Sequence, residues 1–117
     1  MKVDEVKKLQ QKKYRNELRH FLLEGEHLIL ELHKAAFHPT NAQTHLRASE
    51  LFITEEYSHW VDEQLGDHYR VTLVGKKAMS QMSDTKSPQG IIAAVPFAPQ
   101  DSQNNSGNLP RNNGQKE

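Results

Sequence analysis

Residues Ile91-Ile92-Ala93-Ala94-Val95 form the least polar run in the chain, and their pattern indicates the architecture. The five apolar residues are consecutive, whereas a strand with one face in water alternates apolar and polar residues. A strand over 91–95 must therefore be covered on both faces, as happens in the middle of a sheet that lies between two layers of helices. We predict a central strand here.

Three further segments upstream have the length and pattern of strands. Residues 21–23 and 51–53 are short apolar runs, and Tyr69, Val71 and Leu73 alternate with polar residues. Each of these segments is followed by a helical pattern. Strands that alternate with helices indicate crossover connections, and hence a sheet that is mostly parallel or mixed.

Apolar residues at helical spacing fill the segments between the predicted strands. One stripe predicts a surface helix over 3–13, and a second predicts a helix that follows Gly25 and ends at Pro39. A third helix should have Thr54 as its N-cap and Gly66 as its C-cap, with a short fourth helix after the next strand. The stripe residues of the four helices are Val3, Val6 and Leu9; Leu28, Leu32, Ala35 and Ala36; Tyr57, Trp60, Val61 and Leu65; and Ala78, Met79 and Met82. The sequence therefore predicts an α/β fold, a three-layer α/β/α sandwich around a four-stranded sheet.

The composition excludes several classes of protein. A chain of 117 residues has room for one domain, and no apolar run nears the roughly 20 residues that span a bilayer. The lack of cysteine excludes disulfide-stapled folds and thiol enzymes, and it agrees with a cytoplasmic location. There are seven histidines, but without cysteines or an HExxH motif we predict no metal site. With no G-x-S-x-G elbow and no glycine-rich phosphate loop, we predict no catalytic residue either.

The last twenty residues differ from the rest in composition. From Ala98 to Glu117 the only apolar residues are Ala98 and Leu109, and asparagine, glycine and proline are frequent. Such a segment buries too little apolar surface to offset the entropy lost on ordering. We predict one folded domain over 1–97 and a disordered polar tail over 98–117.

Charge is distributed unevenly along the chain although it sums to zero. Residues 1–20 carry seven basic and three acidic groups, residues 21–68 carry two and nine, and residues 69–90 carry four and one. Two basic segments therefore flank an acidic middle. Where such segments meet in space they form a patch that attracts phosphate, and where they do not they form a solubilising surface.

Two segments carry residue types suited to binding a nucleic acid. In the first, Lys12, Lys13 and Arg15 offer phosphate contacts around Tyr14, nine residues before the turn Glu24-Gly25. Gly25 has no Cβ, so the backbone there can turn and come close to a ligand. As structure alone, the same residues read as a packed tyrosine and an ordinary strand-to-helix turn.

The second segment is Ser83-Asp84-Thr85-Lys86-Ser87-Pro88-Gln89-Gly90, which leads into the last strand. Pro88 restricts the backbone and Gly90 permits a tight turn. Its hydroxyls, the amide of Gln89 and Lys86 can contact phosphate, ribose or a base edge. The plainer interpretation is a loop that joins a helix to a strand.

Together the two segments resemble the N-terminal substrate-binding domain of SpoU-type RNA 2′-O-ribose methyltransferases, which belong to the knotted SPOUT class. The resemblance runs from about Lys8 to Val95 and is carried by Lys13-Tyr14-Arg15, Phe21-Leu22-Leu23-Glu24-Gly25 and the stretch from Met82 to Ile91. It implies a sandwich of the ribosomal-protein type that binds kinked RNA, with ribosomal or transfer RNA as partner. It places RNA contacts at Arg15, Glu24, Gly25, Thr85, Pro88, Gln89 and Gly90, to which Lys12, Lys13 and Lys86 are added for their charge.

The chain also departs from that family. There, a longer catalytic domain with a trefoil knot follows and binds S-adenosylmethionine, whereas here a short polar tail follows Val95. We therefore expect a domain that holds structured RNA, contains no cofactor, catalyses nothing by itself and is monomeric without the knotted domain.

Two other functions remain open at this stage. The acidic middle could be the face of a protein-interaction module that meets a basic partner without affinity for RNA, with Glu55, Glu56 and Glu63 as its contacts. Alternatively, scattered carboxylates could serve a small enzyme, although no motif supports one.

Overall fold

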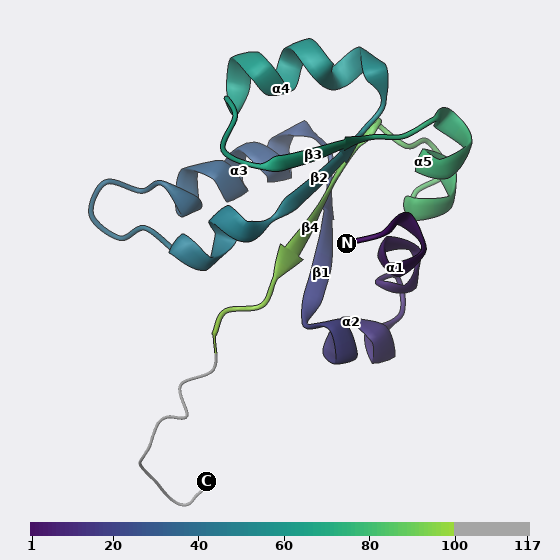
Figure 1. Cartoon of the computed structure of the whole chain (residues 1–117), viewed down its shortest axis with the longest axis horizontal. Coiled ribbons are helices and arrows are strands. Elements are labelled where there is room, and N and C mark those ends of the chain that lie inside the picture. The colour runs from purple at the N-terminus through teal and green to yellow at the C-terminus, as the bar shows by residue number, and fades with distance from the viewer. Residues whose placement is uncertain (100–117) are drawn as a thin grey trace, which may run out of the picture.

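The structure is a computed structural model that describes residues 1–99, so most of the predicted tail lies outside the described residues. Four strands form one sheet in the order β1-β4-β2-β3 (Figure 1). Their bounds are β1 (His20–Glu24), β2 (Glu50–Ile53), β3 (Arg70–Leu73) and β4 (Ile91–Pro96). All four predicted strands are confirmed within one or two residues at each end.

The predicted central strand is confirmed, and the sheet is mixed rather than mostly parallel. β4 lies between β1 and β2 and runs antiparallel to both, while β2 and β3 are parallel. Residues 91–95 are all buried. Ile91, Ala93 and Val95 pack into one core and Ile92 and Ala94 into another, as consecutive apolar residues in a doubly covered strand require.

Helices cover both faces of the sheet, which confirms the three-layer sandwich (Figure 1). One layer contains α3 (Glu26–Ala36), the 3-10 helix η1 (Thr44–Ala48), the 3-10 turn η2 (Glu55–Tyr57) and α4 (Ser58–Gln64). The other contains α1 (Val3–Lys8), α2 (Lys12–Leu18) and α5 (Lys76–Met82). None of the helices in residues 1–99 is long and apolar enough to cross a membrane.

The single helix predicted over 3–13 is wrong, because the chain breaks between α1 and α2. Leu9 is buried and Gln11 has an extended backbone. Between them, the Gln10 side-chain amide donates to the carbonyl oxygens of Gln81 (3.0 Å) and Met82 (2.8 Å). These carbonyls end α5 and have no partner within the helix, so the break supplies the hydrogen bonds that they lack.

Other boundary predictions also need correction. Thr54 does not cap α4, since η2 intervenes and the Thr54 hydroxyl makes no cap hydrogen bond. Gly66 does follow the end of α4 with a positive φ of 70°, as predicted. Beyond the predicted helix end at Pro39 the chain also forms η1, which buries Leu46.

Some residues of the predicted apolar stripes are exposed. The buried stripe of α3 includes Ile29 instead of Leu28, which is 47% exposed. Leu73 is 59% exposed because β3 is an edge strand, while Tyr69 just before it is buried.

An aromatic cluster joins α3 to the start of β3. The Tyr69 hydroxyl hydrogen-bonds His33 Nδ1 at 2.8 Å, and the rings of His33 and His68 are 5.8 Å apart. Burial lowers the pKa of His33 below its usual 6.5, and the charge of His68 lowers it further. The fold therefore favours the neutral imidazole.

Acid should consequently destabilise the fold through His33. Because its folded pKa lies below 6.5, the unfolded chain binds this proton more readily, and stability falls as the pH drops through the folded pKa. We expect the free energy of unfolding, measured by urea denaturation at about pH 7 and about pH 5, to fall less in His33→Gln than in the unaltered chain. His27→Gln, at an exposed position of the same helix, should keep the full decrease. An equal decrease in both variants would contradict this role for His33.

Candidate functional site

The C-terminal ends of β1, β2 and β3 and the start of β4 lie at the same end of the sheet, in the upper right of Figure 1. β4 runs opposite to the other three strands, so it starts where they end. The turn Glu24-Gly25, the residues after β2 and β3, and the loop 83–90 are thereby gathered together. Ligands of open α/β sheets bind outside the carboxyl ends of parallel strands, so this edge is the natural place for a site.

Direct hydrogen bonds join the two segments that the sequence singled out. The buried Ser83 hydroxyl lies 2.8 and 2.7 Å from the two carboxylate oxygens of Glu24 and donates to this carboxylate. The Thr85 amide in turn donates to Ser83 Oγ at 3.1 Å. On the other side, Gln89 Oε1 accepts from the Glu26 amide at 3.3 Å. The loop 83–90 and the turn Glu24-Gly25 therefore form one continuous surface.

Gly25 and Gly90 are required by contacts within the protein. Gly25 has a φ of 101°, and a Cβ there would lie 3.0 Å from Gln89 Oε1. Gly90 has a φ of 106°, and its Cβ would lie 2.8 Å from the Thr54 hydroxyl oxygen and 3.2 Å from the Tyr57 ring. Both glycines are buried. The missing Cβ of Gly25 lets the turn approach Gln89 of the loop 83–90, and the missing Cβ of Gly90 lets that loop approach Thr54 and Tyr57.

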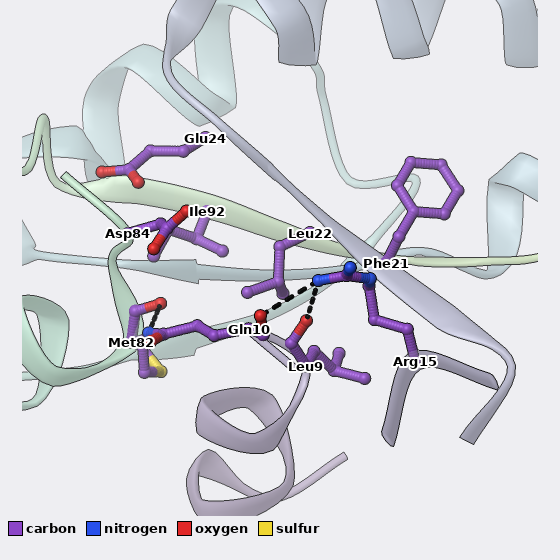
Figure 2. A pocket seen from close by; sticks show the side chains of 9 residues that line it. All are labelled: Leu9, Gln10, Arg15, Phe21, Leu22, Glu24, Met82, Asp84 and Ile92. Atoms are coloured by element: carbon purple, nitrogen blue, oxygen red, sulfur yellow. Dashed lines mark hydrogen bonds between the residues drawn. The ribbon is translucent and has the colours of Figure 1, made fainter. Parts of the chain in front are cut away.

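Arg15 lines a cavity of about 260 Å³ between α1, β1 and the start of the loop 83–90 (Figure 2). Glu24 and Asp84 of the joined segments line the same cavity. Nη1 of Arg15 donates to the carbonyl oxygens of Leu9 and Gln10, both at 3.1 Å, and so holds the turn between α1 and α2. The cavity is lined by Leu9, Gln10, Arg15, Phe21, Leu22, Glu24, Met82, Asp84 and Ile92. Arg15 thus has a structural role in addition to facing the cavity.

Pro88, Gln89 and Gly90 line a second cavity, of about 270 Å³, on the side of α5. Lys76 and Ser80 of α5 line it as well, together with Glu56. The loop 83–90 therefore contributes to both cavities. Thr85 and Lys86 are exposed in this loop.

Lys12 and Lys13 line neither of these cavities. They are exposed at the start of α2, and Lys13 Nζ lies over the Tyr14 ring at 5.4 Å from its centre. The structure thus brings Arg15, Glu24 and the loop 83–90 together and leaves the two lysines beside them on the helix that carries Arg15.

Charge separates by layer. The basic segments form α1, α2, α5 and the loop 83–90, and α1 packs against α5 through Val6, Leu9, Met79 and Met82. Most of the acidic middle forms α3, η2 and α4, on the opposite face of the sheet. Glu63 pairs with His59 at 3.3 Å there, and Glu55 and Glu56 share a cavity with Lys76. The two basic segments therefore meet in space.

Sequence reasoning missed two residues that organise this site. Ser83 was quoted only as part of its loop, although its hydroxyl joins the loop to Glu24. Gln10 carried no signal, since its carbonyl partners lie about seventy residues away in sequence. Within residues 1–99 no group of three potential metal ligands is found.

Comparisons with known proteins agree with this geometry. The family model described as "MRM3-like substrate binding domain" matches residues 1–93. No curated protein matches the chain. Among solved structures, an AdoMet-bound rRNA methyltransferase from Sinorhizobium meliloti is 21% identical, with a TM-score of 0.59 over 81% of this chain and 33% of that one.

A second solved structure has the same fold. It is described as "a putative RNA methyltransferase of the TrmH family from Porphyromonas gingivalis" and is 17% identical, with a TM-score of 0.56 over 85% of this chain and 35% of that one. The chain spans about a third of the length of the solved structures that it matches. At these low sequence identities, the similarity to the solved structures shows a shared fold and nothing more.

The close packing around Gly90 yields a stability test. Gly90→Ala should lower the free energy of unfolding by about 3 kcal/mol, because alanine is strained at this φ and its Cβ meets Thr54 and Tyr57. Gly75→Ala is the matched control, since nothing lies within 4 Å of the new Cβ and φ is −76°. Denaturation should place that variant within about 1 kcal/mol of the unaltered chain. Equal stability of the two variants would show that the turn relaxes without cost.

Proposed function

The chain belongs to the MRM3-like substrate binding domain family, and from this premise we propose that it holds folded RNA for a 2′-O-ribose methyltransferase. The observation that carries the proposal is that both basic segments lie on one face of the sheet, beside the joined loops. We assign the RNA contacts to Arg15, Glu24 and the exposed residues of the loop 83–90, with Lys12 and Lys13 at the margin. Ribosomal or transfer RNA is the proposed partner.

Electrostatics supports this assignment. Residues 1–20 and 69–90 together carry eleven basic groups against four acidic ones. Lysine and arginine gathered on one face attract the phosphate backbone without regard to sequence. The acidic layer on the opposite face repels it, so the RNA should approach from the side of α1, α2 and α5.

The loops would add recognition of RNA shape. Their hydrogen bonds and close glycine contacts hold polar groups in fixed positions, and folded RNA is recognised mostly by shape and by contacts to phosphates and ribose hydroxyls. The buried glycines would not touch RNA themselves but would allow the backbone conformation of the loops. Thr85, Lys86 and Gln89 are exposed and can contact RNA directly.

We assign no catalytic step to this chain. The resemblance places S-adenosylmethionine in a knotted domain, whereas the cavities described above are lined by the ends of a four-stranded sheet and its helices. The monomeric state and the cytoplasmic location stay predictions from the sequence.

RNA affinity should decrease with salt. Fluorescence anisotropy with a labelled ribosomal RNA hairpin should give a linear loss of log affinity with log salt concentration, because bound lysines and arginines release counterions. Lys86→Gln should reduce the slope by about one unit if Lys86 meets a phosphate, and Arg15→Gln should do the same. Denaturation of Arg15→Gln checks that the turn held by its guanidinium survives.

Lys34→Gln provides the matched control. This change removes the same charge from α3, in the acidic layer, where Lys34 pairs with Glu31 at 3.4 Å. Its slope should equal that of the unaltered chain. An affinity that does not change with salt would rule out the proposed electrostatic surface.

A further inference from the structure

We infer that the cavity between α1, β1 and the start of the loop 83–90 holds one unpaired guanine base of the RNA. The inference rests on the proposed function and names the chemistry that this part of the surface recognises. Three features carry it: apolar walls, two carboxylates at one end, and a guanidinium at the other (Figure 2).

The walls suit a flat aromatic ring. Leu22 is half-buried, lies between the charged ends in Figure 2 and offers apolar surface to a base. Met82 and Ile92 line the cavity as well but are fully buried. Unstacked bases in folded RNA are recognised by packing against side chains and by hydrogen bonds to their edges. The cavity of about 260 Å³ opens on the face that carries the basic helices, where the RNA is expected.

The two carboxylates determine which part of an RNA can enter. Glu24 and Asp84 both line the cavity, and Figure 2 shows them on the side away from Arg15. Phosphates are repelled by carboxylates, which accept hydrogen bonds but do not donate them when ionised. The RNA group that fits this end must therefore present hydrogen-bond donors, which are the ribose hydroxyls and the N–H groups of the bases. Of these two, only a base also has a flat apolar face for the walls.

Guanine matches this requirement best of the four bases. Its N1–H and N2 amino group are adjacent donors on one edge, a pattern that carboxylates accept in charge-assisted hydrogen bonds. Uracil presents one N–H between two carbonyl oxygens, which the carboxylates would repel. Adenine and cytosine present an amino group next to an acceptor nitrogen, so each satisfies the acidic end only partly.

The polar groups are held in place before any ligand arrives. Ser83 fixes the carboxylate of Glu24, while the lone pairs not used by this hydroxyl remain able to accept. Nη1 of Arg15 is occupied by Leu9 and Gln10, which orients its other nitrogens. Those nitrogens would meet the phosphate of the same nucleotide, with Lys12 and Lys13 on the same helix.

The test compares RNA hairpins that differ at one base. The hairpins share a stem and an unpaired uridine loop that carries a single guanosine, inosine or uridine, and anisotropy with the full chain measures their affinities. Inosine lacks only the N2 amino group. We expect the guanosine hairpin to bind about tenfold more tightly than either of the others, as the loss of one hydrogen bond to a carboxylate implies.

Three acid-to-amide variants, one of them a control, test which carboxylates cause the preference for guanosine. Asp84→Asn should reduce the difference between guanosine and inosine to less than about twofold, because the new amide places a donor where the base also donates. Asp67→Asn, an equal change at an exposed position of the acidic layer, should leave the tenfold preference intact. Glu24→Gln should act as Asp84→Asn does, and denaturation shows whether the loop that Ser83 ties to it stays folded.

The outcomes separate the two proposals. Equal affinity for guanosine and inosine hairpins, with the salt slope intact, overturns the guanine site and leaves the RNA-binding function standing. Loss of the preference in Asp67→Asn as well as in Asp84→Asn also overturns the site, since general charge would then explain it. Absent or salt-independent binding of every hairpin overturns both.

Discussion

Because β4 is buried on both faces, it determines how the other strands and both helical layers are arranged. β4 lies between β1 and β2 and runs against both, so the loop before it arrives among the ends of the other three strands. Two segments some sixty residues apart in sequence can then touch. The hydrogen bond from Ser83 to Glu24 is therefore a consequence of sheet topology as much as of local sequence.

Much of the fold follows from local patterns. Apolar runs located β1, β2 and β4, and an alternating pattern located β3. The unbroken run at 91–95 predicted both the central position and the two helical layers. The break between α1 and α2 could not be predicted in this way, because its cause is the contact of Gln10 with carbonyls at the end of α5. Likewise, the exposure of Leu73 depends on β3 being an edge strand, which no short pattern reveals.

The candidate site shows the same division. The turn Glu24-Gly25 and the loop 83–90 stood out by residue type, but which groups they offer depends on tertiary contacts. Gly25 and Gly90 make room for Gln89, Thr54 and Tyr57, so the side chains left to face a ligand are fewer than the motif residues. Arg15 similarly uses Nη1 of its guanidinium to hydrogen-bond the turn before α2, so fewer of its donors remain for a ligand.

A basic surface alone binds any RNA, because phosphates are the same at every position. The carboxylates of Glu24 and Asp84 lower that general attraction where they stand, so their presence inside a basic layer has a cost for binding. In the proposed complex, this loss of attraction would be offset only when a base edge with matching donors fills the cavity and hydrogen-bonds the carboxylates. Selectivity would then come chiefly from the penalty on bases that leave the carboxylates facing acceptors, while the lysines and arginines would supply most of the affinity.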